Sequence, residues 1–202
     1  MLGLTVWEIL VVAIAITVIF LLVVALLPVN GDSPGGRDRL DCMNNVRMIV
    51  GLLEAANTAG YPPHSGPNLI LYLVKTGDIF AREDYLEVLF CPGDKKESLE
   101  LAGGVDAYDA VDLGSRKNGH LTSYAGRNQD DTSCRATGDA ADLILICDDS
   151  EHHHRGRGLM VGLGGGWVKW RSKVDDYRMD ESAVLTVGPG STVDELKCLV
   201  AD

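Results

Sequence analysis

The feature that most constrains this chain is an uninterrupted apolar run near its N-terminus. Residues 9–27 read ILVVAIAITVIFLLVVALL, and Thr17 is the only polar residue among them. As an α-helix these 19 residues span roughly 28 Å, close to the roughly 30 Å hydrocarbon core of a bilayer. A helix inside a soluble domain is rarely apolar on every side for so long. We therefore expect a membrane-spanning helix over residues 4–28, a linker over 29–36 and a globular domain over 37–202.

Glu8 separates this run from a plain membrane anchor and from a signal peptide. A cleaved signal peptide has a basic start and a shorter apolar core, whereas nothing basic precedes residue 9. A carboxylate at the membrane edge costs up to about 3 kcal/mol if it is drawn to the bilayer centre. A plain anchor gains nothing from such a residue, so Glu8 is a candidate for a specific function.

The segment around Glu8 resembles a known processing signal. Residues 3–12 read GLTVWEILVV, which is similar to the type IV prepilin signature, typically G-F-T-L-I-E-L-L-V-V. In that family a peptidase cuts after the Gly and methylates the new N-terminus. The resemblance implies a leader of residues 1–3 and cleavage between Gly3 and Leu4. It also makes Glu8 the fifth mature residue, which in pilins pairs with the N-terminal amine of a neighbouring subunit during assembly.

A second resemblance follows the apolar run. Residues 42–52 read CMNNVRMIVGL and are followed by GYPP at 60–63. This pattern is similar to the C-x-N-N-L-R-Q-I-G-L-A-L and G-x-Y-P-P segments of planctomycete-type pilin-like proteins. The CPGD at 91–94 resembles their C-P-x-D element. Residues 154–168 resemble their H-x-G-x-x-N-V-L-F-A-D-G-H-V ending, although Gly165 and Trp167 replace its Asp and His, so no polar role is carried over there.

The pattern of the globular part, together with these resemblances, predicts an α+β, pilin-like fold. We expect an N-terminal transmembrane helix and a second helix, residues 37–59, packed on an antiparallel sheet of about four strands. The second helix carries an apolar stripe at three- and four-residue steps. The members of the stripe are Cys42, Val46, Ile49, Val50, Leu53 and Ala56.

Strand signals are concentrated in the second half of the chain. Residues 122–125 and the apolar run 143–147 each predict a strand, and the glycines of 164–166 predict a hairpin between their apolar flanks. Residues 80–89 predict a helix passing into a strand, and 99–119 a surface loop. Finally, Thr192 and Glu195 are spaced as a capping box, which predicts a last helix through Leu199.

The cysteines exclude some common sites. The five are Cys42, Cys91, Cys134, Cys147 and Cys198. None are spaced as CxxC, so neither a zinc knuckle nor a thioredoxin-like site is indicated. Since five is odd, at least one cysteine is free or pairs between chains. In an exported domain one or two disulfides are expected, with the pairing left open.

The charge argues against a nucleic-acid partner, and we expect no cofactor. A net charge of −11 repels phosphate backbones. One stretch nevertheless has metal-ligand chemistry, because Asp148, His152 and His154 follow a predicted buried strand and His120 offers a further imidazole. The alternative interpretation of this stretch is an exposed polar loop.

Other residues offer weaker functional candidates. Acidic loops could supply oxygen ligands for calcium, although none has EF-hand spacing. Their acidic residues are Asp106, Asp109, Asp112, Asp130 and Asp131. Trp167 and Trp170 are candidate subunit-interface residues. No serine lies in a nucleophile elbow and the glycines of 162–166 do not form a phosphate loop, so we predict no catalytic residue.

The expected function is therefore structural: a pilin-like or pseudopilin subunit of a type II secretion or type IV pilus-type filament, and not an enzyme. Its partners would be other pilin-like subunits, a prepilin peptidase and the inner membrane, with the globular domain in the periplasm or at the cell surface.

The leader has no Lys or Arg, whereas Arg37 and Arg39 follow the run. This reverses the usual charge asymmetry. Either translation starts upstream of Met1, which we favour, or the short leader is inserted by other means. The alternatives to a filament subunit are a membrane-tethered metal- or ligand-binding module using His152 to His154, and an exported hydrolase with an uncleaved anchor.

Overall fold

The structure is a computed structural model, in which the globular part of the chain forms one compact unit. The residues described below are 36–57, 60–93, 98–136 and 141–201. None of the helices formed by these residues has the length and apolar character needed to cross a bilayer. The predicted membrane helix, residues 4–28, lies outside the described residues and stays a prediction.

The predicted second helix is confirmed as α2, Gly36–Ala56. Its apolar stripe is the buried side of the helix. The buried members are Cys42, Val46, Ile49, Val50 and Leu53. The helix begins one residue earlier than expected, within the predicted linker. It ends ahead of Pro62 and Pro63, which cannot continue a helix.

Five antiparallel strands form one sheet, in the order β4-β3-β2-β1-β5. The strands are β1 (Tyr124–Arg127), β2 (Ile144–Asp148), β3 (Gly158–Leu163), β4 (Val168–Ser172) and β5 (Leu199–Val200). The α+β class and the antiparallel sheet are confirmed, with one strand more than expected. The predicted hairpin is β3 and β4, joined by the single turn η4, Gly164–Gly166.

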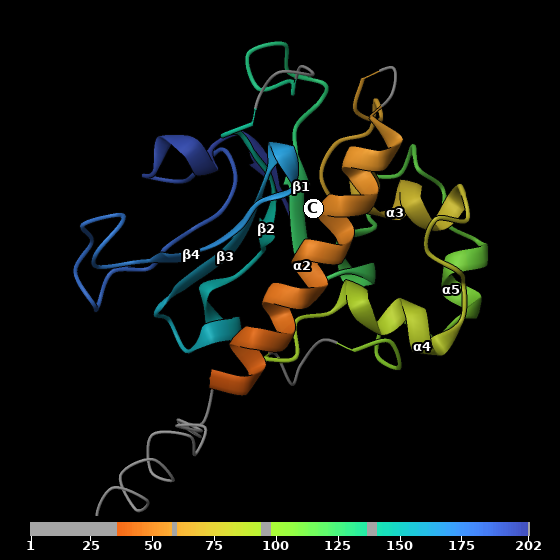
Figure 1. Cartoon of the computed structure of the whole chain (residues 1–202), viewed down its shortest axis with the longest axis horizontal. Helices are drawn as coiled ribbons and strands as arrows, with labels where there is room; N and C mark the ends of the chain where they lie inside the picture. The colour runs from red at the N-terminus through yellow and green to blue at the C-terminus, as the bar shows by residue number, and fades with distance from the viewer. Residues whose placement is uncertain (1–35, 58–59, 94–97, 137–140, 202) are drawn as a thin grey trace, which may run out of the picture. The chain divides into compact units, whose positions relative to one another are not determined.

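Helix α2 packs on one face of this sheet, and a glycine makes the close approach feasible. A Cβ on Gly162 of β3 would lie 2.3 Å from Val50 Cγ2 and 3.0 Å from Val46 Cγ1. The strand therefore presents bare backbone where the stripe of α2 crosses it. Figure 1 shows α2 between the sheet and a group of shorter helices. The opposite face of the sheet is covered by Leu185 and Leu196 from the C-terminal segment.

The shorter helices correct two predictions. They are α3 (Pro67–Lys75), α4 (Glu83–Leu86), η1 (Glu87–Leu89) and α5 (Asp106–Asp109). The segment 80–89 forms helical turns over residues 83–89 and lacks the expected strand, because η1 continues directly from α4. The predicted loop 99–119 is packed rather than superficial, since Tyr108 of α5 is 1% exposed and its hydroxyl donates to Leu121 O at 2.6 Å.

The predicted C-terminal helix is wrong. The segment forms only the turn η5, Asp194–Leu196, with Val193 at its N-cap and no side-chain cap, so the predicted capping box does not form. The chain then extends as β5 and pairs with β1. A disulfide joins Cys134 to Cys198 immediately before β5. Pairing along the sheet edge and this cross-link outweigh the local helix signal.

Candidate metal centre

Four side chains with metal-ligand chemistry meet in the interior, each from a different part of the fold. Cys42 lies on the second turn of α2 and Cys91 in the turn after η1. Asp148 is the last residue of β2, and His154 is the last residue of the short turn η3, Glu151–His154. All four are buried, and their ligand atoms lie within 4.8 Å of one another.

Local packing explains why these elements converge. The buried stripe of α2 directs Cys42 toward the sheet. The turn carrying Cys91 is held against α2 because Asn45 Nδ2 donates to Phe90 O at 3.0 Å. A Cβ on Gly93 would lie 2.0 Å from His153 O, so glycine is required where this turn meets η3. The C-P-G turn and the histidine turn are therefore brought into direct backbone contact.

The carboxylate of Asp148 lies at the centre of the cluster. Cys42 Sγ donates to its Oδ1 at 3.1 Å, and His154 Nε2 lies 3.1 Å from its Oδ2. The backbone N–H of Met160 also donates to Oδ2, at 2.6 Å. Cys91 Sγ lies 3.8 Å from the same Nε2 of His154. One imidazole nitrogen thus faces both a carboxylate oxygen and a thiol sulfur.

The histidines hold the carboxylate in its charged form. Burial would raise the pKa of Asp148, but hydrogen bonds from His153 and His154 lower it to about 2. Burial would lower the pKa of His154, but its hydrogen bonds with Asp148 and Cys91 raise it to about 9. Burial would also lower the pKa of His153, but its hydrogen bonds with Asp148 and Cys91 raise it to about 11. In this arrangement, imidazolium groups therefore balance buried negative charge.

The pKa values of the two thiols, Cys42 and Cys91, shift in opposite directions. The hydrogen bond with Cys42 lowers the pKa of Cys91, and His153 and His154 lower it further. The pKa of Cys42 is raised by its hydrogen bond with Cys91, by burial and by the charge of Asp148. The cluster therefore favours a thiolate at Cys91, and thiolate is the form in which cysteine binds metals.

The geometry suits coordination better than nucleophilic catalysis. In a Cys–His–carboxylate relay, the two nitrogens of the imidazole serve different partners, one the nucleophile and the other the carboxylate. Here Cys91 and Asp148 approach the same nitrogen of His154. Cys91 is also only 1% exposed, so a substrate does not reach its sulfur in this conformation. Converging ligand atoms from four buried side chains are typical of a structural metal site.

The structure brings together half of the metal set predicted from sequence. Asp148 and His154 meet as expected. The His152 side chain is outside the described part of the structure. His120 is exposed and apart from the cluster, with Nδ1 3.0 Å from Lys117 O. Cys42 and Cys91 were missed as ligands.

His153, also missed, flanks the cluster and is 2% exposed. Its Nδ1 lies 3.9 Å from Asp148 Oδ1, and its Nε2 lies 3.3 Å from Asp149 Oδ1.

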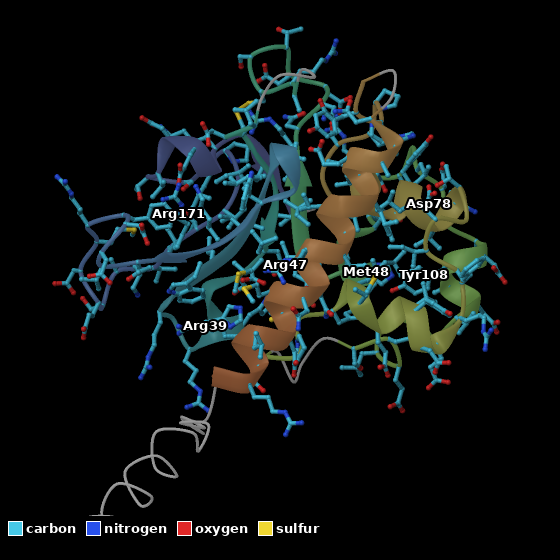
Figure 2. All side chains as sticks on the ribbon, viewed as in Figure 1. Arg39, Arg47, Met48, Asp78, Tyr108 and Arg171 are labelled. Atoms are coloured by element: carbon cyan, nitrogen blue, oxygen red, sulfur yellow. A yellow bond between two sulfur atoms is a disulfide. The ribbon has the colours of Figure 1, made fainter. Side chains whose placement is uncertain are left out.

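The other candidates lie elsewhere. Trp167 is 67% exposed, which leaves it available as an interface residue. Trp170 instead packs inward, with its ring 5.2 Å from that of His154 and the guanidinium of Arg39 4.0 Å above it. Arg39 is labelled on the early part of α2 in Figure 2. The aspartates proposed for calcium are exposed. They are Asp106, Asp109, Asp112, Asp130 and Asp131.

The processing residues Gly3 and Leu4 and the assembly residue Glu8 lie outside the described residues, so their roles stay predictions. No known protein family, curated protein or solved structure that was compared with the chain matches it.

Proposed function

We propose that this protein is a structural subunit, pilin-like or pseudopilin, of a type II secretion or type IV pilus-type filament. The observation that carries the proposal is Glu8 at the start of a 19-residue apolar run, inside a segment that resembles the prepilin signature. In a low-dielectric bundle of helices, a carboxylate needs a positive partner. The N-terminal amine of a neighbouring, processed subunit supplies one.

The described fold supports this proposal. Helix α2 follows the apolar segment along the chain and lays its stripe on an antiparallel sheet. This is the helix-on-sheet arrangement that a pilin-like globular domain requires. The proposed subunit would cross the inner membrane once, over residues 4–28, before assembly. Its acidic domain would face the periplasm or the cell surface, outside a core of bundled N-terminal helices.

The first test is processing by a prepilin peptidase. We expect co-expression with such a peptidase to shorten the chain by the leader, residues 1–3, because cleavage follows Gly3. Gly3→Val places a branched side chain at the cleavage position and should leave the chain at full length. Gly31→Val, outside the signature, is the matched control and should be processed normally. Intact-mass measurement of the wild type, Gly3→Val and Gly31→Val shows whether each chain has lost residues 1–3. Cleavage of Gly3→Val to the same extent as the wild type would contradict the assignment.

Metal binding is a second candidate function, favoured by one specific observation. The alternative predicted from sequence was a membrane-tethered metal-binding module that uses the His152 to His154 stretch. The cluster of Cys42, Cys91, Asp148 and His154 gives this stretch a geometry in which metal binding is feasible. Such a site is compatible with a filament subunit, since the metal ligands belong to the globular domain and the proposed assembly segment is the N-terminal helix.

A further inference from the structure

We propose that Cys42, Cys91, Asp148 and His154 form a structural site for one zinc-class divalent ion, which fastens α2 to the sheet. The proposal concerns the globular domain alone and goes beyond the filament function. It stands whether or not the N-terminal segment is processed.

The spacing of the ligand atoms is close to that of a tetrahedral site. Zinc bonds of about 2.3 Å to sulfur and about 2.0–2.2 Å to nitrogen and oxygen give ligand–ligand edges of roughly 3.3–3.8 Å. The observed separations are 3.1 Å from Cys42 Sγ to Asp148 Oδ1, 3.1 Å from His154 Nε2 to Asp148 Oδ2, and 3.8 Å from Cys91 Sγ to His154 Nε2. The ligand atoms, one from each residue, all lie within 4.8 Å of one another. Shifts of up to about 1 Å would therefore bring them onto the edges of a tetrahedral site.

The donor set selects the class of metal. Two thiolates and an imidazole are soft or borderline ligands, which suit zinc and are poor ligands for calcium or magnesium. One carboxylate oxygen from Asp148 completes four protein ligands. All four residues are buried, at 0% for Cys42, 1% for Cys91, 0% for Asp148 and 6% for His154. A closed set of four protein ligands is characteristic of structural rather than catalytic zinc.

Surrounding groups hold the ligands in place. Asp148 Oδ2 accepts the Met160 N–H at 2.6 Å, which fixes the carboxylate from the side of β3. The Tyr124 hydroxyl lies 3.8 Å from Cys42 Sγ, and Trp170 packs edge-on against His154. Such outer contacts orient metal ligands. A divalent cation would also offset the negative charge that two thiolates and a carboxylate place in the interior.

The competing arrangement of the two thiols is a disulfide. The structure closes Cys134–Cys198 as a disulfide but leaves Cys42 and Cys91 as thiols. A disulfide between them would make no use of the carboxylate and imidazole that converge on the same sulfurs. The four-residue convergence therefore favours the ion.

The test is metal content and cobalt spectroscopy of the full chain, purified in detergent with zinc in the growth medium. We expect one zinc ion per chain. After exchange with cobalt, we expect thiolate-to-cobalt charge-transfer absorption and the intense visible bands of tetrahedral cobalt. Cys42→Ser and Cys91→Ser should each lose the metal and the charge-transfer bands. Cys147→Ser is the matched control, because Cys147 is also a buried thiol beside Asp148 but packs in the opposite core cluster, and it should keep the metal.

Three results would overturn the proposal. The first is a wild-type chain that takes up no zinc or cobalt after reduction and reconstitution. The second is a native chain in which mass spectrometry of peptides finds Cys42 linked to Cys91. The third is a metal analysis in which Cys42→Ser and Cys91→Ser both retain the metal, or in which the bound metal is calcium. If a ligand variant fails to fold, the spectrum of Cys147→Ser decides the question. Thiolate ligation produces the charge-transfer bands, and Cys42 and Cys91 are the free cysteines left in that variant.

Discussion

Glu8→Ala should abolish filament assembly and leave the globular domain folded. The substitution makes the N-terminal helix more apolar, so membrane insertion is retained. It removes the partner of a neighbour's N-terminal amine, and leaving one charge of a buried pair unpaired costs about 3–5 kcal/mol. Because that cost recurs at every subunit contact in the filament, the loss of assembly should be complete.

Filament yield is compared between cells that produce the wild-type chain and cells that produce Glu8→Ala. Sheared filaments are measured by sedimentation and by electron microscopy, and folding is measured by thermal melting of the purified chain. Thr17→Ala is the matched control, since Thr17 is the only polar residue of the apolar run. We expect this control to assemble as the wild type does. Filaments of normal yield from Glu8→Ala would count against the proposed role of Glu8.

Ile49→Ala should strongly destabilise the globular domain, whereas Met48→Ala should change little. Ile49 is 0% exposed in the core between α2 and the sheet, while its neighbour Met48 is 53% exposed. Figure 2 labels Met48 on α2. Truncating a buried Ile costs about 2–5 kcal/mol in lost burial and cavity formation. A loss of that size is a large share of the roughly 5–15 kcal/mol that stabilises a typical domain.

Urea unfolding under non-reducing conditions measures this difference and keeps the Cys134–Cys198 disulfide intact. We expect the free energy of unfolding to fall by about 2–5 kcal/mol for Ile49→Ala. For Met48→Ala we expect a change of about 0.5 kcal/mol or less. Equal effects of the two substitutions would show that the stripe is not the side of α2 that carries the packing.

The parts of the fold that sequence predicts well are those with a strong local period. The stripe of α2 repeats at helical spacing, so its buried residues follow directly from the sequence. Strand β2 is a short continuous apolar run, and the β3–β4 hairpin is marked by three glycines. In each case the local pattern and the tertiary packing favour the same structure.

The parts that sequence predicts badly depend on distant partners. The C-terminal segment has helix-capping residues, but Val200 pairs with Gly126 and Cys198 is linked to Cys134. Residues 99–119 look polar, yet Tyr108 is 1% exposed and belongs to the same core cluster as buried residues of α2 and α3. Neither partner can be identified from the local pattern, so local propensity gives the wrong answer there.

The candidate metal centre shows the same division. Asp148 and His154 are near one another in sequence, and a polar stretch after a buried strand indicated them. Cys42 is 106 residues from Asp148 and Cys91 is 63 from His154, so only the fold brings them together. Their signals were present but ambiguous, because a cysteine on an apolar stripe also serves as an ordinary core residue.

The most direct test of the proposed filament function is mass spectrometry of the N-terminus of the native protein, purified from its own cells. We expect a mature chain that begins at Leu4 and carries a methyl group on its α-amine, wherever translation starts. A native chain that still contains Gly3 and the residues before it, with no methyl group on Leu4, would contradict it.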